Sequence, residues 1–454
     1  MWNFDAVACA AALEIGNPVY LFHAQHLLYG FLGFCFWKLI SFPFGMIRAL
    51  PALQIFTSLL SAAGLWGLYR LLQQQSRRPL LALIVTCSMA VAAVFWVWSL
   101  EPQVYALGFL GLAWATYFLF RPETSLKWEW VGAWHALAVL GHVVNVLWMI
   151  PALYWIWTDD RLHRANHIQR YLSVLAAGIG IPYLLVLGLF VFPRHDTPFI
   201  LNWLKGSASL TLDRHWQWHG GGLRAPLDWA YTTLSFFWGT FWPYAGQGRG
   251  ILIKTFTFLS ALALMIILFS AWKSKERSIR NFALLWIAAF GLFWWTWEPA
   301  TECYRMGEAV PFAILILLGL ERWARQEIAL GFGTVFAATL LWINWQTRID
   351  PMSRTENNNL YQQTISLAKL TPENSLYLTE GGLPWIYLLY FTGRSGWNVH
   401  LLQPDQIAIR IRQHKAFLAI FIFSSALRDE SVKTWLSTYK LKPVAPGLPW
   451  LQLQ

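Results

Sequence analysis

Charged side chains are scarce in this sequence. Only 13% of its 454 residues are Asp, Glu, Lys or Arg, whereas 57% are hydrophobic and 30 are tryptophan. A soluble domain carries about 25% charged residues, so this chain points to a lipid bilayer as its surroundings. Its repeated apolar runs, bounded by charges or prolines, have the roughly 20 residues needed to cross a hydrocarbon core. The composition excludes an ordinary soluble domain and predicts an α-helical polytopic membrane protein.

Cysteine is also rare, and its spacing excludes the usual cysteine-based sites. Cys9, Cys35, Cys87 and Cys303 lie far apart and form no CxxC pair, so neither a zinc site nor a disulfide framework is indicated. The sequence contains no internal repeat and no low-complexity segment. No motif calls for a cofactor, although a divalent metal would be compatible with the acids and histidines described below.

The formal net charge of +11 comes from 34 basic and 23 acidic residues. Much of the basic charge falls in short clusters between apolar runs, such as RLLQQQSRRP, DDRLHRANHIQR and KSKERSIR. Clusters of this kind are typical of cytoplasmic loops. Nucleic-acid binding would need a basic face on a soluble module. The charge therefore predicts orientation in the membrane and argues against a nucleic-acid partner.

The apolar runs and basic loops predict about 9–11 transmembrane helices. The single spans are expected near residues 47–69, 79–99, 104–120, 171–192, 251–271, 281–297, 306–320 and 328–346. The stretch 131–157 is too long for one span and has the polar centre GHVVN, which predicts two short spans joined at an outer tip. One uninterrupted tilted helix is the alternative. The Trp- and His-rich segment 193–250 is expected to form interfacial helices on the outer side.

The composition changes near residue 350, where short apolar runs alternate with Gly, Pro and Asn. KAFLAIFIFSS predicts a buried strand and SVKTWLSTYKL an amphipathic helix, as in small α/β units. We therefore predict a transmembrane domain over 1–348 and a small C-terminal outer-face (periplasmic) α/β domain over 349–454. The first residues lack the basic and apolar regions of a signal peptide, although the predicted topology places residues 1–46 outside. We expect a first transmembrane helix to precede this sequence.

Unusual polar residues fall in the segments predicted to face outward. They lie in the first outer segment, at the second outer turn, at the GHVVN tip and in the turn WTWEPATECYRMGE. The set comprises Asp5, Glu14, His23, His26, Glu101, Tyr105, His142, Asn145, Glu298, Glu302, Tyr304 and Arg305. Ionisable groups at membrane depth are costly and are functional candidates by default. Their convergence predicts one site at the outer interface.

Several of these residues also have a simpler structural interpretation. Asp5 suits a helix N-cap, since it precedes an apolar run. His23 and His26 are three residues apart and could bind a metal, but interfacial histidines satisfied by water or headgroups are the alternative. His142 and Asn145 could form hydrogen bonds between helices.

The acidic residues leave a similar choice. Glu101 could end one helix before Pro102, and Glu298 and Glu302 could be solvated acids in a loop. As functional groups, carboxylates can act as general bases toward an acceptor hydroxyl, while cationic groups stabilise a departing phosphate. An outer-face site of this kind suits a substrate with a lipid tail and a phosphate-bearing head. The plausible phosphate partners are Arg305, His26 and Arg48, Arg being favoured for its rigid donor fork.

The same segments resemble the GT-C superfamily of membrane glycosyltransferases, which includes protein O-mannosyltransferases and aminoarabinose transferases. NFDAVACAAALEIGNPVYLFHAQHLLY resembles the outer loop of that family, with Asp5 at the position of its catalytic acid. LEPQVYALGF resembles the second acidic motif, carried by Glu101, and AVLGHVVNVLWMIPAL resembles a pair of short helices with His142 at their tip. WEPATECYRMGEAVPFAIL resembles a later loop near the donor phosphate, which assigns to that loop Glu298, Tyr304 and Arg305.

The resemblance implies transfer of a sugar from a polyprenyl-phosphate donor to a glycolipid, glycan or protein acceptor. The reaction would take place at the outer face of the cytoplasmic (inner) membrane, in contact with membrane lipid. Asp5 would be the general base, and Glu101 would support it or position the acceptor. The expected substrate-binding residues are His23, His26, Arg48, Tyr105, His142, Asn145, Glu298, Tyr304 and Arg305.

Two other functions are compatible with the sequence. One is a transporter or flippase of a lipid-linked or small anionic substrate. Transporters tend to show inverted repeats and polar groups near the membrane midplane, whereas here the polar groups are predicted at one interface. The other is an inactive relative that keeps the fold.

Overall fold

The structure, a computed structural model of the chain, describes most of the sequence. The described residues are 4–16, 21–45, 47–76, 78–122, 126–158, 164–193, 197–204, 225–241, 250–297, 301–323, 325–394, 396–399, 419–428, 430–437 and 439–453. Contacts divide the chain into two compact units, one formed by Met1–Ile15 with Pro351–Gln454 and the other by Gly16–Asp350. The division predicted from the sequence, a transmembrane domain over 1–348 and an outer-face domain over 349–454, stays a prediction.

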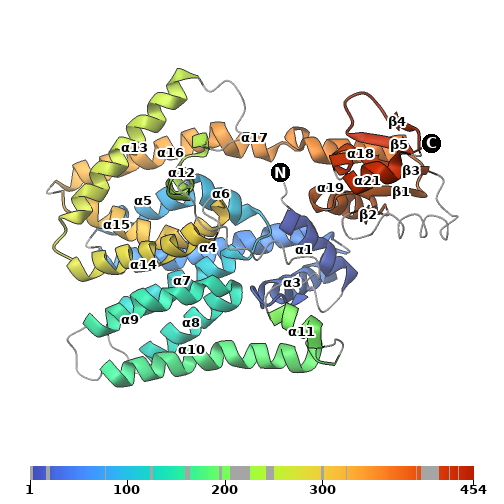
Figure 1. The fold of residues 1–454 in the computed structure, drawn as a ribbon. Coiled ribbons are helices and arrows are strands. Elements are labelled where there is room, and N and C mark those ends of the chain that lie inside the picture. Colours follow the sequence, from blue (N-terminus) through green and yellow to red (C-terminus); the bar gives the residue numbers. More distant parts are fainter. Residues whose placement is uncertain are drawn as a thin grey trace. The chain divides into compact units, whose positions relative to one another are not determined.

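The unit Gly16–Asp350 is a bundle of helices (Figure 1). Its first half contains α3 (Tyr29–Phe44), α4 (Ala49–Gln75), α5 (Pro79–Ala90), α6 (Ala93–Leu100), α7 (Tyr105–Phe120), α8 (Lys127–Gly141), η1 (Val143–Trp148) and α9 (Met149–Thr158). Its second half contains α10 (Arg164–Val186), η2 (Leu187–Val191), α11 (Thr197–Leu204), α12 (Ala225–Phe237), η4 (Gly239–Phe241), α13 (Ile251–Trp272), α14 (Arg277–Thr296), η5 (Glu302–Glu308), α15 (Ala309–Glu321), α16 (Gln326–Asn344) and η6 (Trp345–Ile349).

Within the described residues, six helices are long and apolar enough to cross a membrane, or seven if the bent pair α5–α6 forms one span. The surface of α13 shows the reversed polarity of a membrane helix, since Phe258 is 66% and Phe269 62% exposed. Large apolar side chains in such numbers on a surface mark contact with lipid. By contrast, every residue of α15 from Ala309 to Leu320 is buried, which places this helix at the centre of the bundle. The predicted α-helical polytopic membrane fold is confirmed.

Two predicted spans are interrupted by local backbone features. The expected span 79–99 forms α5 and α6, which meet at an angle of 68°. In 131–157, α8 ends at Gly141 and His142 adopts an extended backbone before η1 begins. The His142 side chain caps η1 by accepting a hydrogen bond from the Val144 amide. One uninterrupted helix over 131–157 is therefore wrong, because this cap starts a new helical segment.

The central helices approach closely where a glycine removes the side chain. In α15, a Cβ at Gly319 would overlap the Ile267 carbonyl of α13. In α7, a Cβ at Gly111 would lie 2.6 Å from the Ala138 amide nitrogen of α8. Small residues at such crossings let helix backbones pack tightly in membranes.

The smaller unit contains a five-stranded mixed sheet with the order β2-β1-β3-β5-β4. Its elements are α1 (Phe4–Ile15), α17 (Asp350–Ser353), η7 (Thr355–Asn357), α18 (Asn359–Leu370), β1 (Ser375–Thr379), α19 (Gly382–Tyr387), η8 (Leu388–Thr392), β2 (Gly396–Asn398), β3 (Ala419–Phe423), η9 (Ser424–Arg428), α21 (Glu430–Leu436), β4 (Leu441–Pro443) and β5 (Trp450–Leu453). β1 pairs in parallel with β2 and β3, and β5 pairs antiparallel with β3 and β4. The predicted strand and helix near 420 and 435 correspond to β3 and α21, and the small α/β fold is confirmed.

The N-terminal helix α1 belongs to this smaller unit. Tyr390 of η8 donates a hydrogen bond of 3.0 Å from its hydroxyl to Oε1 of Glu14 in α1. The sheet itself is stabilised by two apolar layers. Leu376, Leu378 and Ile422 lie in one, and Tyr377 and Phe421 in the other, as the alternation of side chains along β1 and β3 requires.

Candidate functional site

The segment 21–28 packs against the break between α8 and η1. Leu28 donates a backbone hydrogen bond of 3.1 Å to the Leu140 carbonyl, and Val143 donates one of 2.8 Å to the Gln25 carbonyl. These bonds join two parts of the chain that are more than a hundred residues apart. They bring the predicted site residues His23, His26 and His142 into one region.

The three imidazoles form a cluster in which His26 and His142 are uncharged near neutral pH. The rings of His23 and His26 stack with their centroids 4.2 Å apart. Desolvation, and then the charge of His23, lowers the pKa of His142 to about 4. The pKa of His26 is also well below its usual value because of desolvation and the neighbouring rings of His23 and His142. Neutral imidazoles can both donate and accept hydrogen bonds.

A second set of rings continues from His142. The Tyr105 ring, at the start of α7, stacks on His142 with centroids 5.3 Å apart and meets Tyr304 of η5 edge-on at 5.6 Å. Tyr304 in turn stacks on Trp294 of α14 at 4.1 Å, with an interplanar angle of 7°. We call Tyr105, His142, Trp294 and Tyr304 the ring cluster. Three of its four members were predicted as substrate-binding residues from separate sequence segments.

Asn145 has a structural role at the same break. Its side-chain amide donates to the Ala138 carbonyl at 2.9 Å. The Asn145 carbonyl lies 2.9 Å from Nε2 of His135, whose Nδ1 lies 2.6 Å from the Tyr171 hydroxyl. This buried network connects α8, η1 and α10. Substrate binding by Asn145 stays a prediction. The contacts seen here are those of the alternative, in which Asn145 forms hydrogen bonds between helices.

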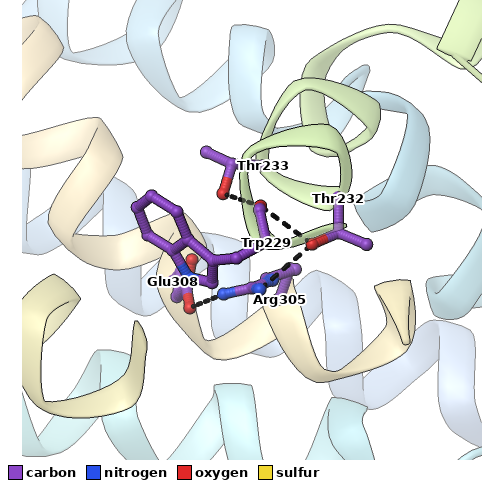
Figure 2. A network of polar contacts seen from close by, with 5 residues as sticks. All are labelled: Trp229, Thr232, Thr233, Arg305 and Glu308. Carbon is purple, nitrogen blue, oxygen red and sulfur yellow. Dashed lines mark hydrogen bonds and ion pairs between the residues drawn. The ribbon is translucent and has the colours of Figure 1, made fainter. Parts of the chain in front are cut away.

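Arg305 lies inside the bundle and is fully buried. Its Nη1 donates to Oε1 of Glu308 at 2.8 Å, and its Nη2 donates to the hydroxyl of Thr232 in α12 at 3.0 Å (Figure 2). The guanidinium carbon lies 5.6 Å from the ring centroid of Trp229, within range of a cation–π interaction. Arg305 therefore ties α12 to η5.

A second buried ion pair lies in the same bundle. Nη2 of Arg348 in η6 lies 2.9 Å from Oε2 of Glu302 in η5, and both side chains are almost wholly buried. Ser235 of α12 also lies beside the Glu302 carboxylate. The interpretation of Glu302 as a solvated loop acid is wrong, because Arg348 compensates its charge inside the protein. α12 thus contacts both ion pairs, through Thr232 and Ser235. This helix is part of segment 193–250, which was expected to lie at the membrane interface.

The remaining predicted residues lie in different settings. Glu101 is buried and follows the last residue of α6, where Pro102 prevents the helix from continuing. Arg48 is exposed at the N-cap of α4. Asp5 is exposed in the first turn of α1, rather than at its cap, and its charge adds to desolvation in raising the pKa of Cys9 to about 12. Glu298 lies outside the described residues.

Sequence reasoning missed several residues of these networks. Trp294, His135, Glu308 and Arg348 were not among the predicted site residues. ECYRMGEAV contained a usable signal for Glu308, since an Arg and a Glu three residues apart beside an apolar run suggest a local ion pair. Nothing in the sequence near Arg348 names Glu302 as its partner. Within the described part of the chain, no group of three or more His, Cys, Asp or Glu side chains is placed to hold a metal ion.

Comparison with known proteins identifies relatives by structure alone. No family model and no curated protein matches the sequence. The structure resembles that of ArnT from Cupriavidus metallidurans in the apo state, with a TM-score of 0.65 and 12% identity over 99% of this chain and 92% of that one. It resembles ArnT bound to undecaprenyl phosphate equally well, at 13% identity.

The structure is also similar, though less closely, to that of a second enzyme. The oligosaccharyltransferase of Archaeoglobus fulgidus, in complex with Zn and sulfate, matches with a TM-score of 0.52 and 12% identity. The match covers 96% of this chain and 66% of that one. Both proteins are glycosyltransferases of the GT-C class. This chain therefore has the fold of the GT-C membrane glycosyltransferases.

Proposed function

We propose that this protein transfers a sugar from a polyprenyl-phosphate donor to an acceptor at the outer face of the cytoplasmic membrane. The observation that carries the proposal is the likeness, along 99% of this chain, to a protein crystallised with undecaprenyl phosphate. The helices suited to span a membrane support a substrate with a lipid tail. The neutral histidines and the ring cluster supply hydrogen-bonding and stacking groups for its head.

The proposed reaction is a displacement at the anomeric carbon. The acceptor hydroxyl loses its proton to a carboxylate, and its oxygen forms a bond to the anomeric carbon. The bond between that carbon and the phosphate oxygen breaks, and its electron pair leaves with the polyprenyl phosphate. A carboxylate serves as the base and helps to stabilise the oxocarbenium-like charge. We assign the base to Asp5, which is exposed in α1, and a supporting role to Glu101.

Two arginines are proposed to hold the donor phosphate. Arg48 is exposed, so an anion can reach its guanidinium from outside the protein. Arg305 is fully buried against Glu308, so a phosphate would have to replace that carboxylate at the guanidinium. Both groups would stabilise the negative charge that develops on the departing phosphate. Of the histidines, His26 is the proposed phosphate partner, donating a hydrogen bond, and His23 and His142 would contact the donor head nearby.

Native mass spectrometry of the gently purified protein tests the donor class. A retained polyprenyl phosphate, with or without its sugar, is expected on the wild type and on Arg325→Ala, a matched control at an exposed arginine. Arg48→Ala and Arg305→Ala are expected to lose it. If only bulk phospholipid is retained across several mild detergents, the proposed donor is wrong, and transport becomes the function to test.

A further inference from the structure

The ring cluster has a rigid side and an accessible side. Trp294 is 1% exposed and stacks in parallel on Tyr304, so it fixes the plane of that ring. Tyr105, His142 and Tyr304 are each only half-buried. Three rings of the cluster are thus partly accessible, and the buried Trp294 ring packs behind Tyr304.

The accessible rings come from three elements that contact one another. Tyr105 begins α7, His142 precedes η1, and Tyr304 lies in η5. Tyr105 and His142 stack nearly face to face, while Tyr304 meets both at steep angles of 74° and 64°. The result is an aromatic corner rather than a flat patch. Its rings are held by mutual contacts and lose little conformational entropy when a ligand binds.

Two polar imidazoles at this corner, those of His26 and His142, are uncharged at neutral pH. His142 is neutral at pH 7, since desolvation lowers its pKa to about 4. His23 lies close enough to lower the pKa of His142, and both His23 and His142 lower the pKa of His26. Aromatic faces with neutral hydrogen-bonding groups at their edge suit a ligand that has both C–H surfaces and hydroxyls. A phosphate would instead be matched by cationic donors.

We propose that Tyr105, His142 and Tyr304 form the subsite for the sugar ring of the donor, and that Trp294 is a positioning residue that holds Tyr304 in place. The inference rests on the proposed function and specifies which part of the donor binds here. The C–H face of a sugar ring carries a slight positive charge and packs against the negative face of an aromatic ring. His23 hydrogen-bonds the sugar hydroxyls at the edge of the corner, beside His26, the proposed phosphate partner.

Paired lipid probes test the inference. The affinity of the purified protein is measured for undecaprenyl phosphate and for undecaprenyl phosphates that carry glucose, galactose, mannose or arabinose. The wild type is expected to bind at least one sugar-bearing lipid more tightly than undecaprenyl phosphate. Tyr304→Ala is expected to weaken binding of that lipid by about three- to tenfold, the scale of one aromatic contact, and to leave undecaprenyl phosphate unchanged.

Matched variants separate binding from folding. Tyr304→Phe and Trp294→Phe keep a ring and are expected to keep the preference, whereas Trp294→Leu is expected to lose it. Tyr154→Ala removes another half-buried tyrosine, in α9, and is expected to change neither affinity.

Each failure has a distinct meaning. If the wild type binds undecaprenyl phosphate but prefers none of the sugar-bearing lipids, the sugar subsite is wrong and the proposed donor class stands. An equal loss of both affinities in Tyr304→Ala also overturns the subsite. If the wild type binds none of these lipids, the proposed function itself fails.

Discussion

Arg305 and Glu308 form an ion pair of 2.8 Å in which neither side chain exposes any surface. The two residues are three positions apart in η5, immediately before the buried helix α15. Burying two charges is costly unless they compensate each other. The pair is therefore a point at which the stability of the bundle depends on two particular side chains.

Removing one partner is expected to be far more damaging than removing both. Glu308→Gln leaves the guanidinium of Arg305 buried without its counter-charge and is expected to cost about 3–5 kcal/mol in the free energy of unfolding. SDS titration in mixed micelles measures this change. The double variant Arg305→Met with Glu308→Leu removes both charges and is expected to fall close to the wild type. Equal stability of Glu308→Gln and the wild type would contradict this account.

Two neighbouring threonines allow a closely matched comparison (Figure 2). Both threonines donate to the Trp229 carbonyl within their own helix, and Thr232 also accepts a hydrogen bond from Arg305. Thr232→Val removes a bond to a charged group and is expected to cost about 1.5–3 kcal/mol of unfolding free energy. Thr233→Val removes only a local bond and is expected to cost less than about 1 kcal/mol. A larger cost at Thr233 than at Thr232, in the same titration, would show that Arg305 does not anchor α12.

The crossing of α13 and α15 is sensitive to a single methyl group. Gly319→Ala places a Cβ on the Ile267 carbonyl, and we expect a loss of about 1–3 kcal/mol in stability. Gly331→Ala in α16 meets no atom within 4 Å and should stabilise its helix by about 0.5–1 kcal/mol. Thermal unfolding of the two variants in one detergent checks the opposite signs. The same sign for both would mean that the close crossing is misplaced.

Acid should destabilise the histidine cluster. In the unfolded chain His142 titrates near its ordinary pKa of about 6.5, whereas its pKa in the folded protein is about 4. Between these values the unfolded state binds more protons, so stability falls as pH decreases from about 6.5 toward 4 and is independent of His142 above that range. The lowered pKa of His26 acts in the same direction, and partial exposure of both rings limits the size of the effect.

His142→Asn isolates this contribution, because Asn keeps an acceptor for the Val144 amide but does not titrate. The melting temperature of this variant should decrease less between pH 7.5 and 5 than that of the wild type. Parallel curves for the two proteins would show that protonation of His142 is not linked to unfolding.

The spans were predictable because hydropathy and length act locally. α4, α13, α14 and α16 each contain one uninterrupted apolar run bounded by polar residues, and the predicted ranges agree with them. The α5–α6 bend lies inside a run that is apolar throughout. Hydropathy contains no information on such a bend, because it depends on packing against other helices.

Part of the ring cluster was predictable, because its residues stand out from apolar surroundings. His142, Tyr105 and Tyr304 were found in this way, and the structure joins their rings. Trp294 was not found, since one tryptophan among 30 has no distinguishing neighbour in the sequence. The partner of Glu302 was missed for a related reason. Arg348 lies 46 positions later, and only the fold brings the two together.

Consumption of the donor tests the central claim most directly. Purified protein is mixed with acceptor-containing membrane extract and polyprenyl-phosphate sugars, and release of polyprenyl phosphate is followed by mass spectrometry. We expect release by the wild type and by Glu356→Gln, which alters an exposed carboxylate, and none by an equally expressed Asp5→Asn. Equal release by Asp5→Asn would contradict the role of Asp5, and no release by the wild type with any donor would contradict glycosyl transfer itself.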